Sequence, residues 1–399
     1  MQSRWRVGSL FGIPLFVDSS WFLILLLVTF LYGSNPGWQS SFGVLTAWVG
    51  GFALAILLFG SVVLHELGHS FAAISQGIRV NSITLFLFGG IASIDKESKT
   101  PEEALQVAIA GPLVSFGLFL TLTLVLNAVE LPALAEVLLG TVAQTNLVLT
   151  VFNMIPGLPL DGGQVLKALV WKFTGSRTQG VRWAARVGQI LGWSAIAAGI
   201  FAYITAQRFD YLWIALLGWF AVRNASTYNR MSDLQDAIAS LSAQDAMARE
   251  FRVVDANLTL RHFADEYLLQ DGRSPVYFAA SDGRYRGLVS VDDLRATERS
   301  QWEVLTLKDI AKPLTTIPSV SETTALQAVI QDLEVQDLNR ITVLTPADAV
   351  AGTIDRGDIV RAIAQKLNIR LSEAVIQRIK EEGAYPPGLQ LQAIAEAAD

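Results

Sequence analysis

Residues 60–70 read Gly60-Ser-Val-Val-Leu-His65-Glu66-Leu67-Gly68-His69-Ser70 and lie late in a long apolar stretch. On a helix, positions i and i+4 share a face, so His65 and His69 can hold one metal ion between their imidazoles. Glu66 then lies beside the open coordination position, as in the H-E-x-x-H arrangement of zinc hydrolases, where the glutamate is the general base. A purely structural role is disfavoured, because three ionisable groups in one membrane span are costly to bury.

The composition indicates a membrane body followed by a soluble part. Of the 399 residues, 52% are hydrophobic and 17% charged, whereas an ordinary soluble domain has about 25% charged residues. Residues 1–227 hold 22 charged residues, and residues 228–399 hold 44. The chain has no cysteine, which excludes disulfides, iron–sulfur clusters and thiolate zinc sites. It has three histidines, and two of them form the pair above.

Six stretches are apolar and long enough, or nearly so, to cross a bilayer, which takes about 20 residues. They run over about Ser19–Tyr32, Leu45–Ile74, Ala104–Val129, Leu134–Ile155, Ala184–Ile204 and Tyr211–Ala225. The first 18 residues are interpreted as an interfacial segment rather than a cleaved signal peptide. Twelve Lys and Arg residues fall on one side of these spans and Arg208 alone on the other. We therefore expect a multi-pass protein of a bacterial plasma membrane with both termini cytoplasmic.

The segment Val80–Ile94, between the second and third spans, is rich in β-branched and aromatic residues and is interrupted by Gly89-Gly90. This pattern favours a hairpin or strand pair at the cytoplasmic face. A plain connecting loop is the alternative, although polar residues are sparse there.

A catalytic zinc site usually has three protein ligands, so the two histidines need a partner. Most acidic residues of the membrane body lie near span ends or in loops, which leaves Asp161 in Asn153-Met-Ile-Pro156-Gly-Leu-Pro159-Leu160-Asp161-Gly162-Gly163. The second and fourth spans run in the same direction, so the histidine pair and Asp161 can meet in their cytoplasmic halves. Alternatively, Asp161 caps a helix that begins near Gly162, with Gln164 completing a capping box.

His65-Glu66-Leu-Gly-His69 followed by Asn153-x-x-Pro156-x-x-Pro159-x-Asp161-Gly162 resembles the site-2 protease family of intramembrane zinc metalloproteases, over residues 1–227. Ala110-Gly111-Pro112 is also similar to the family pattern. The resemblance implies that His65, His69 and Asp161 bind one zinc ion and that Glu66 is the catalytic base. It further implies that Asn153 contacts the substrate or the transition state, although an Asn there can also satisfy free carbonyls.

The implied substrate is a transmembrane segment, which must unwind locally because a helix hides its carbonyls in hydrogen bonds. The predicted hairpin, with Gly89 and Gly90 at its bend, could offer an edge strand to the unwound segment. The cut is expected in the cytoplasmic half of the substrate. Anti-sigma factors and leftover signal peptides are the substrate classes that the resemblance suggests.

Residues 243–366 contain a repeat with an offset of 65 residues. Arg286-Gly287-Leu-Val-Ser290-Val-Asp292-Asp293-Leu294 matches Ala351-Gly352-Thr-Ile-Asp355-Arg-Gly-Asp358-Ile359. Each copy is interpreted as helix, strand, turn, strand and helix, and the pair resembles a soluble α+β tandem CBS module. The predicted divisions are 1–227 for the protease domain, 228–242 for a linker, 243–303 and 304–367 for the CBS copies, and 368–399 for a helix and tail to which we assign no function.

The CBS resemblance implies adenine-nucleotide binding, with Ser290, Asp293 and Asp358 as contacts. The second copy has Asp355 where Ser or Thr is typical, and a carboxylate there repels phosphate. The alternative is that Asp293 and Asp358 serve only as helix N-caps. Such a module would gate substrate access or allow the enzyme to form homo-oligomers.

The sequence thus predicts a six-span helical membrane protein with a cytoplasmic hairpin and a soluble tandem module, acting as an intramembrane zinc metalloendopeptidase. Its partners are transmembrane substrates, the lipid bilayer and an adenine nucleotide, and no nucleic acid is expected. A CBS-gated transporter or channel is one alternative, which the lack of an inverted repeat disfavours. A catalytically inactive member of the family is the other, which the complete motif residues disfavour.

Overall fold

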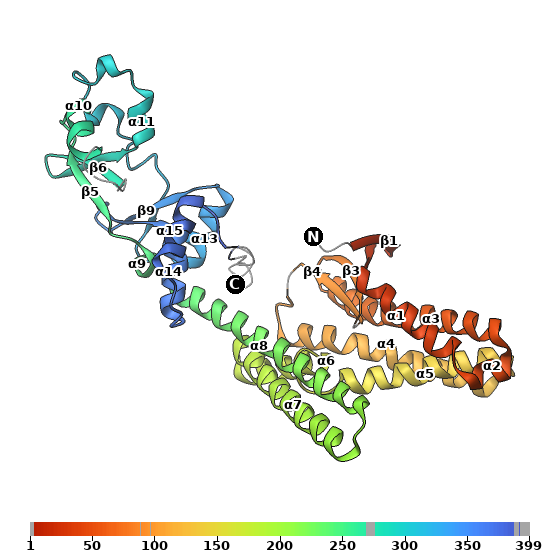
Figure 1. Ribbon diagram of the computed structural model, residues 1–399. Coiled ribbons are helices and arrows are strands. Elements are labelled where there is room, and N and C mark those ends of the chain that lie inside the picture. Colours follow the sequence, from red (N-terminus) through yellow and green to blue (C-terminus); the bar gives the residue numbers. More distant parts are fainter. Residues whose placement is uncertain (1–3, 88, 96, 269–275, 387–390, 392–399) are drawn as a thin grey trace. The chain divides into compact units, whose positions relative to one another are not determined.

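A computed structural model describes residues 4–87, 89–95, 97–268, 276–386 and 391. The chain divides into two compact units, Met1–Ser232 and Asp233–Asp399, and each is described by itself (Figure 1). The division falls inside the predicted linker 228–242. Residues 228–240 of that linker are helical, because α8 runs over Leu212–Ser240.

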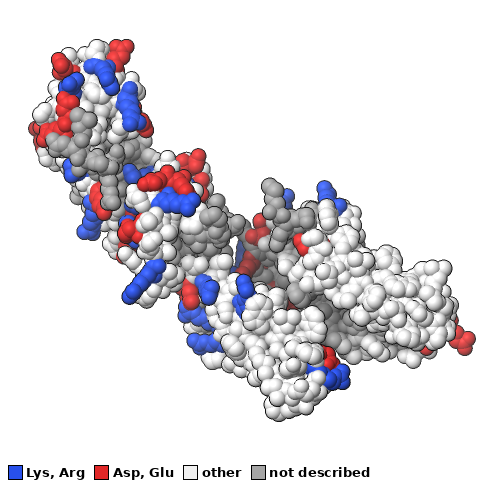
Figure 2. Space-filling view, in the orientation of Figure 1, with Lys and Arg blue, Asp and Glu red and all other residues white. Residues whose placement is uncertain are grey.

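The first unit is built of long helices joined by short loops. The helices before α8 are α1 (Ser19–Gly33), α2 (Pro36–Phe42), α3 (Val44–Ser75), α4 (Pro101–Ala128), α5 (Ala133–Asn153), α6 (Asp161–Thr174) and α7 (Arg177–Ala206). A short 3₁₀ turn, Phe209–Tyr211, precedes α8. In Figure 2 the faces over α1, α3 and α5 carry few charged side chains, as lipid-facing helices require.

Within the described residues, four helices are long and apolar enough to cross a membrane, namely α3, α4, α5 and α7. The count rises to five if the bent pair α1 and α2, which meet at 64°, forms one broken span. The structure therefore does not confirm the predicted count of six spans. The first predicted span is short because α1 has 15 residues, about 22 Å of helix. The sixth falls short because α8 turns polar from Arg223 onward.

A four-stranded sheet lies at one end of α3 and α4, and α2 lies at the other (Figure 1). The strands are β1 (Arg4–Leu10), β2 (Ile13–Asp18), β3 (Val80–Phe86) and β4 (Gly89–Ile94), in that order across the sheet. β3 and β4 form an antiparallel hairpin, as predicted, and β2 pairs parallel to β3. The N-terminal segment was predicted only as interfacial, and its hairpin was missed. This hairpin turns at Phe11 and Gly12, both of which have positive φ, so Gly12 is the residue in the sequence that could have indicated the turn.

The sheet is fixed to α3 by a small apolar core. Ile13 and Val17 of β2, Ile83 and Leu85 of β3, and Leu67 of α3 are each at most 4% exposed and belong to one cluster. Since Leu67 lies between His65 and His69 in the sequence, this packing places the sheet beside the histidine pair.

The second unit contains two sheets of the same topology. The first is β5 (Phe251–Asp255), β6 (Val276–Ser281) and β7 (Arg284–Val289), and the second is β8 (Ser319–Ser321), β9 (Arg340–Leu344) and β10 (Val350–Asp355). In each sheet the first strand pairs parallel to the middle strand and the last pairs antiparallel to it. This shared pairing supports the 65-residue repeat.

The helices of the two repeats are exchanged between their cores. α9 (Ala243–Ala246) packs in the core of the second repeat, beside α13 (Leu326–Val335) and α14 (Arg356–Lys366). α12 (Leu307–Ile310) packs in the core of the first, together with α10 (Leu260–Phe263) and α11 (Val291–Ala296). The short turns Ala264–Leu268 and Arg299–Gln301 complete the first repeat. A last helix, α15 (Glu373–Glu382), covers α14.

Candidate metal centre

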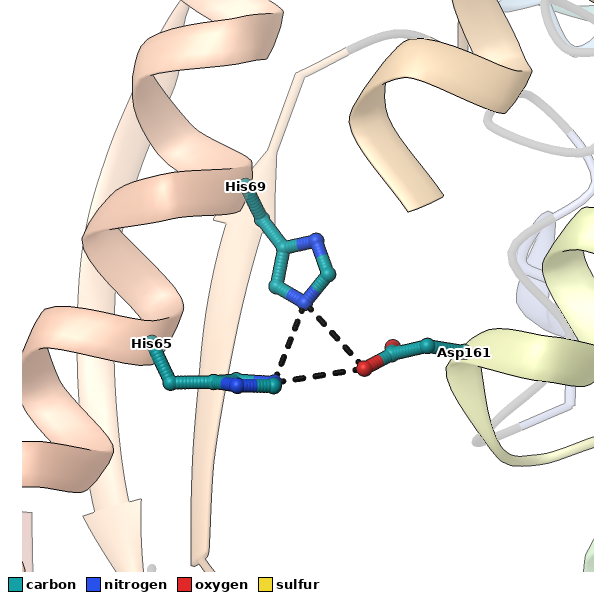
Figure 3. A group of neighbouring side chains, drawn as sticks. All are labelled: His65, His69 and Asp161. Carbon is teal, nitrogen blue, oxygen red and sulfur yellow. Dashed lines mark hydrogen bonds and ion pairs between the residues drawn. The ribbon is translucent and has the colours of Figure 1, made fainter. Parts of the chain in front are cut away.

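The two histidines of α3 point to the same side of the helix, as their i,i+4 spacing predicts (Figure 3). His65 is buried, with 4% of its surface exposed, and its Nε2 lies 3.3 Å from His69 Nε2. Asp161, the first residue of α6, points into the same space. Its Oδ2 lies 3.2 Å from His65 Nε2 and 3.4 Å from His69 Nε2. The structure thus brings together all three residues that the sequence proposed as ligands.

Asp161 does not cap α6 in the structure, contrary to the alternative interpretation of its sequence. The residue that precedes the first turn of α6 is Leu160, and no side chain caps this helix. Both histidine contacts of Asp161 are made by its Oδ2, so its carboxylate serves the cluster.

Hydrogen bonds on the far side of each ring orient the histidines. His69 Nδ1 donates to the carbonyl oxygen of Val107 in α4, at 2.7 Å. His65 Nδ1 lies 2.9 Å from the hydroxyl of Ser115, which is fully buried in α4 and can accept a hydrogen bond from the ring N–H. Such outer contacts fix the ring tautomer and leave Nε2 facing inward as the ligand atom. Ser115 was not predicted from the sequence, although it lies four residues after Gly111 of the Ala110-Gly111-Pro112 segment.

Close approach of α3 and α4 makes these contacts reachable, and two glycines permit it. A methyl group at Gly68 would lie 2.8 Å from the carbonyl oxygen of Ala110, and one at Gly111 would collide with the His69 ring. Small residues let helix backbones approach closely inside a membrane. The Ala110-Gly111-Pro112 segment therefore acts here by leaving space for His69.

The three inward-facing atoms fit a bound zinc ion. In a neutral ring that donates from Nδ1 to Val107, Nε2 of His69 carries a lone pair that can bind a metal. Two such nitrogens and a carboxylate oxygen, 3.2–3.4 Å from one another, would attract a cation placed among them. Atoms bound to tetrahedral zinc at about 2.0–2.1 Å lie about 3.3–3.4 Å apart, so the observed spacing matches this ion.

Glu66 lies between the helix and the sheet. A methyl group at Gly90 of β4 would be 3.2 Å from Glu66 Oε1, and the backbone N–H of Ala92 donates to the same carboxylate. Gly89 and Gly90 are the first two residues of β4. Asn153, the last residue of α5, has its amide nitrogen 3.5 Å from His65 Nε2. Its side chain therefore reaches the cluster, at the long limit of a hydrogen bond.

The predicted nucleotide contacts differ between the two repeats. Ser290 is the N-cap of α11 and accepts a hydrogen bond from the backbone of Asp292. Asp293, in the same first turn, pairs with Lys312 at 3.0 Å. The capping alternative named Asp293 and Asp358, but the structure has Ser290 and Asp355 as the N-caps.

Asp358 is 2% exposed and shares a capping box with Asp355. Burial and the neighbouring Asp355 raise the pKa of Asp358 to about 6, against the opposing effect of Lys380. Lys380 of α15 lies 2.5 Å from Asp358 and 3.3 Å from Asp355. In the second repeat, Lys380 of α15 therefore pairs with Asp358, which was predicted to contact a nucleotide, and with the neighbouring Asp355.

Comparison with known proteins gives the family. Residues 53–137 and 130–195 match the model of peptidase family M50. A Synechocystis protein, named as an inferred zinc metalloprotease, is 40% identical over 366 residues, covering 91% of this chain and 96% of that protein. The zinc metalloprotease MJ0392 of Methanocaldococcus jannaschii is 29% identical over 360 residues, covering 90% of this chain and 96% of that protein.

Two kinds of solved structure each match part of the chain. The site-2 protease from M. jannaschii is 32% identical, with a TM-score of 0.42, and covers 57% of this chain and 96% of its own. The CBS domain of a bacterial CNNM/CorC family Mg²⁺ transporter in complex with ATP is 15% identical, with a TM-score of 0.28. It covers 34% of this chain and 94% of its own. Since a 40% identical relative aligns along nearly the whole chain, this protein belongs to peptidase family M50, the site-2 protease family of intramembrane zinc metalloproteases.

Proposed function

We propose that this chain is an active zinc endopeptidase that cleaves peptide bonds within or near transmembrane segments of other membrane proteins. His65, His69 and Asp161 hold one zinc ion per chain, and Glu66 is the general base. The observation that carries the proposal is the triangle of inward-facing ligand atoms at 3.2–3.4 Å, oriented from behind by Val107 and Ser115. The complete set of motif residues argues against an inactive member of the family.

The chain's own residues supply the proton transfers. Bound zinc would lower the pKa of water and stabilise negative charge on a carbonyl oxygen. Glu66 takes a proton from the attacking water and passes it to the departing amine nitrogen. The amide of Asn153, which reaches the cluster, donates a hydrogen bond to the substrate backbone.

The edge strand β4 receives the unwound substrate in this proposal. β4 ends the sheet order β1-β2-β3-β4, so one side of its backbone is unpaired within the sheet. An extended peptide can add to such an edge through main-chain hydrogen bonds. Because Gly90 lies against Glu66, a peptide on this edge would pass close to the general base.

The membrane topology is part of the same proposal. α1 with α2, and α8, cross the bilayer in addition to the four clear spans, which gives six crossings and two cytoplasmic termini. The Lys and Arg bias of the loops supports this orientation in a bacterial plasma membrane. The cut then falls in the cytoplasmic half of the substrate, since the cluster lies at the ends of α3 and α5 that face the sheet.

Replacing Glu66 with Gln removes the general base while leaving the proposed ligands in place. We expect cleavage of a reconstituted single-pass substrate to fall by about 10²-fold or more, with zinc content unchanged. Mass spectrometry of the products and metal analysis of the same sample measure both quantities. Glu136→Gln, in the first turn of α5, is the control and should cleave normally. Wild-type cleavage by Glu66→Gln would contradict the proposal.

Ser115→Ala removes the hydroxyl that orients His65 from behind. Loss of such an outer contact lowers metal affinity by about 10–100-fold, so we expect zinc to dissociate at correspondingly lower chelator concentrations. Ser61→Ala is a matched control, because Ser61 is also buried but bonds only to the Leu58 carbonyl of its own helix. Equal zinc retention in the two variants would show that Ser115 does not support the site.

The second unit is proposed to bind an adenine nucleotide in its first repeat, through Ser290 and Asp293, and to adjust proteolysis or pair two chains. Asp293 supports this because one of its carboxylate oxygens, Oδ2, is buried without a hydrogen-bond partner among the described residues. Titration calorimetry of the full-length protein with ATP, ADP and AMP should give heat with at least one of them, weakened by Asp293→Asn. No heat with any nucleotide would remove the sensing role.

A further inference from the structure

The carboxylate of Glu97 ties the segment that leaves the edge strand to α6 and α7. Hydrogen bonds from Asp95 N to Arg79 O and from Ser98 Oγ to Gln76 Oε1 lead instead back toward α3 and β3. Residues 95–100 connect β4 to α4, and Glu97 lies in this connection. Its Oε2 lies 3.1 Å from Lys167 Nζ in α6 and 2.6 Å from Arg177 Nη2, in the first residue of α7. One oxygen therefore joins three separate elements of the first unit.

Lys167 is unusual because a lysine is rarely buried without a partner. It is 9% exposed, and its carbonyl lies against Gly180, where an added methyl group would collide with it. The tight packing of α6 on α7 thus confines Lys167. An ammonium group in this position needs a counter-ion, and Glu97 supplies it. Together Lys167 and Arg177 hold the pKa of Glu97 below its ordinary value, although burial alone would raise it.

The ion pair between Glu97 and Lys167 connects two elements of the proposed site, β4 beside Glu66 and α6 with Asp161. β4, which ends three residues before Glu97, contacts Glu66 through Gly90. α6, which carries Lys167, begins at Asp161. The ion cluster therefore links the strand beside the general base to the helix that presents the third ligand, by a path outside the metal cluster.

We propose that Glu97 is a positioning residue. It fixes the position of the edge strand β4 relative to α6, so that a peptide added to β4 lies at the metal site. This inference rests on the proposed function, because it assigns β4 to the substrate. Glu97 touches neither the ligands nor Glu66 in any contact that the structure records, so it acts through β4 and α6. Removing its charge should loosen β4 and weaken substrate binding, while the chemistry at the metal site stays intact.

The chain offers a matched control pair. Glu102, in the first turn of α4, pairs with Lys172 of α6 at 3.0 Å. It joins the same α6 to a point five residues after Glu97, and the two carboxylates are equally exposed, at 53% for Glu102 and 54% for Glu97. The cations differ, because the side chain of Lys172 is 54% exposed and that of Lys167 is 11% exposed. Ion pairs with both members exposed contribute little. Glu102→Gln therefore removes a similar carboxylate whose cation is exposed, and which lies in α4 and not in the connection from β4.

The test compares Glu97→Gln, Glu97→Asp and Glu102→Gln as full-length proteins in micelles. Hydrogen–deuterium exchange of peptides covering Gly89–Ile94 should be faster in Glu97→Gln, nearly normal in Glu97→Asp, and unchanged in Glu102→Gln. With a cleaved substrate, KM should rise by about tenfold in Glu97→Gln, with kcat changed much less. Zinc content should equal that of the wild type in all three.

Unchanged exchange over β4 in Glu97→Gln, or equal acceleration in Glu102→Gln, would overturn the inference. A fall in kcat with no change in KM would also overturn it, since this pattern belongs to the chemistry and not to substrate positioning. If the wild-type protein cleaves no substrate, the proposed function fails, whereas the exchange measurement still decides whether Glu97 holds β4.

Discussion

The first unit is organised around an electrostatic constraint, because two imidazoles and a carboxylate meet inside a bundle of apolar helices. His65, His69 and Asp161 face one another at 3.2–3.4 Å, and hydrogen bonds behind the rings keep the lone pairs turned inward. Positive charge is needed to hold a carboxylate and two imidazoles together in a medium where charges are poorly screened. In the proposed function zinc would supply this charge, and the metal would then also stabilise the fold around it.

The rest of the unit serves this arrangement by bringing helices closer than ordinary side chains would allow. Gly68 and Gly111 let α3 approach α4, and without them the Val107 carbonyl would be out of reach of His69. Gly162 and Gly163 pack the start of α6 directly on the backbone of residues 154–158, which fixes where Asp161 enters. The sheet then covers the remaining side, with Gly90 against Glu66. Small residues thus position the site, and the larger residues supply its chemistry.

Sequence alone predicted the residues whose spacing encodes the chemistry, and it failed where contacts depend on tertiary packing. The i,i+4 histidine pair and the charge-poor spans identified His65, Glu66, His69 and Asp161, and the β-branched run identified the β3–β4 hairpin. Ser115 was missed, because a serine in an apolar helix gives no sign of which histidine it will face. The predicted count of six spans was not confirmed, because α1 is short and α8 is apolar over only part of its length. In the second unit, nothing in the repeat indicated that Lys380 would pair with both Asp355 and Asp358.

The account makes the metal centre its central claim, and X-ray absorption at the zinc edge tests it most directly on the purified protein. We expect one zinc per chain, with a first shell of nitrogen and oxygen atoms at about 2.0–2.1 Å and the outer-shell scattering of two imidazoles. Asp161→Asn should change that shell. A protein that binds no zinc, or a spectrum without the two imidazoles, would contradict the account.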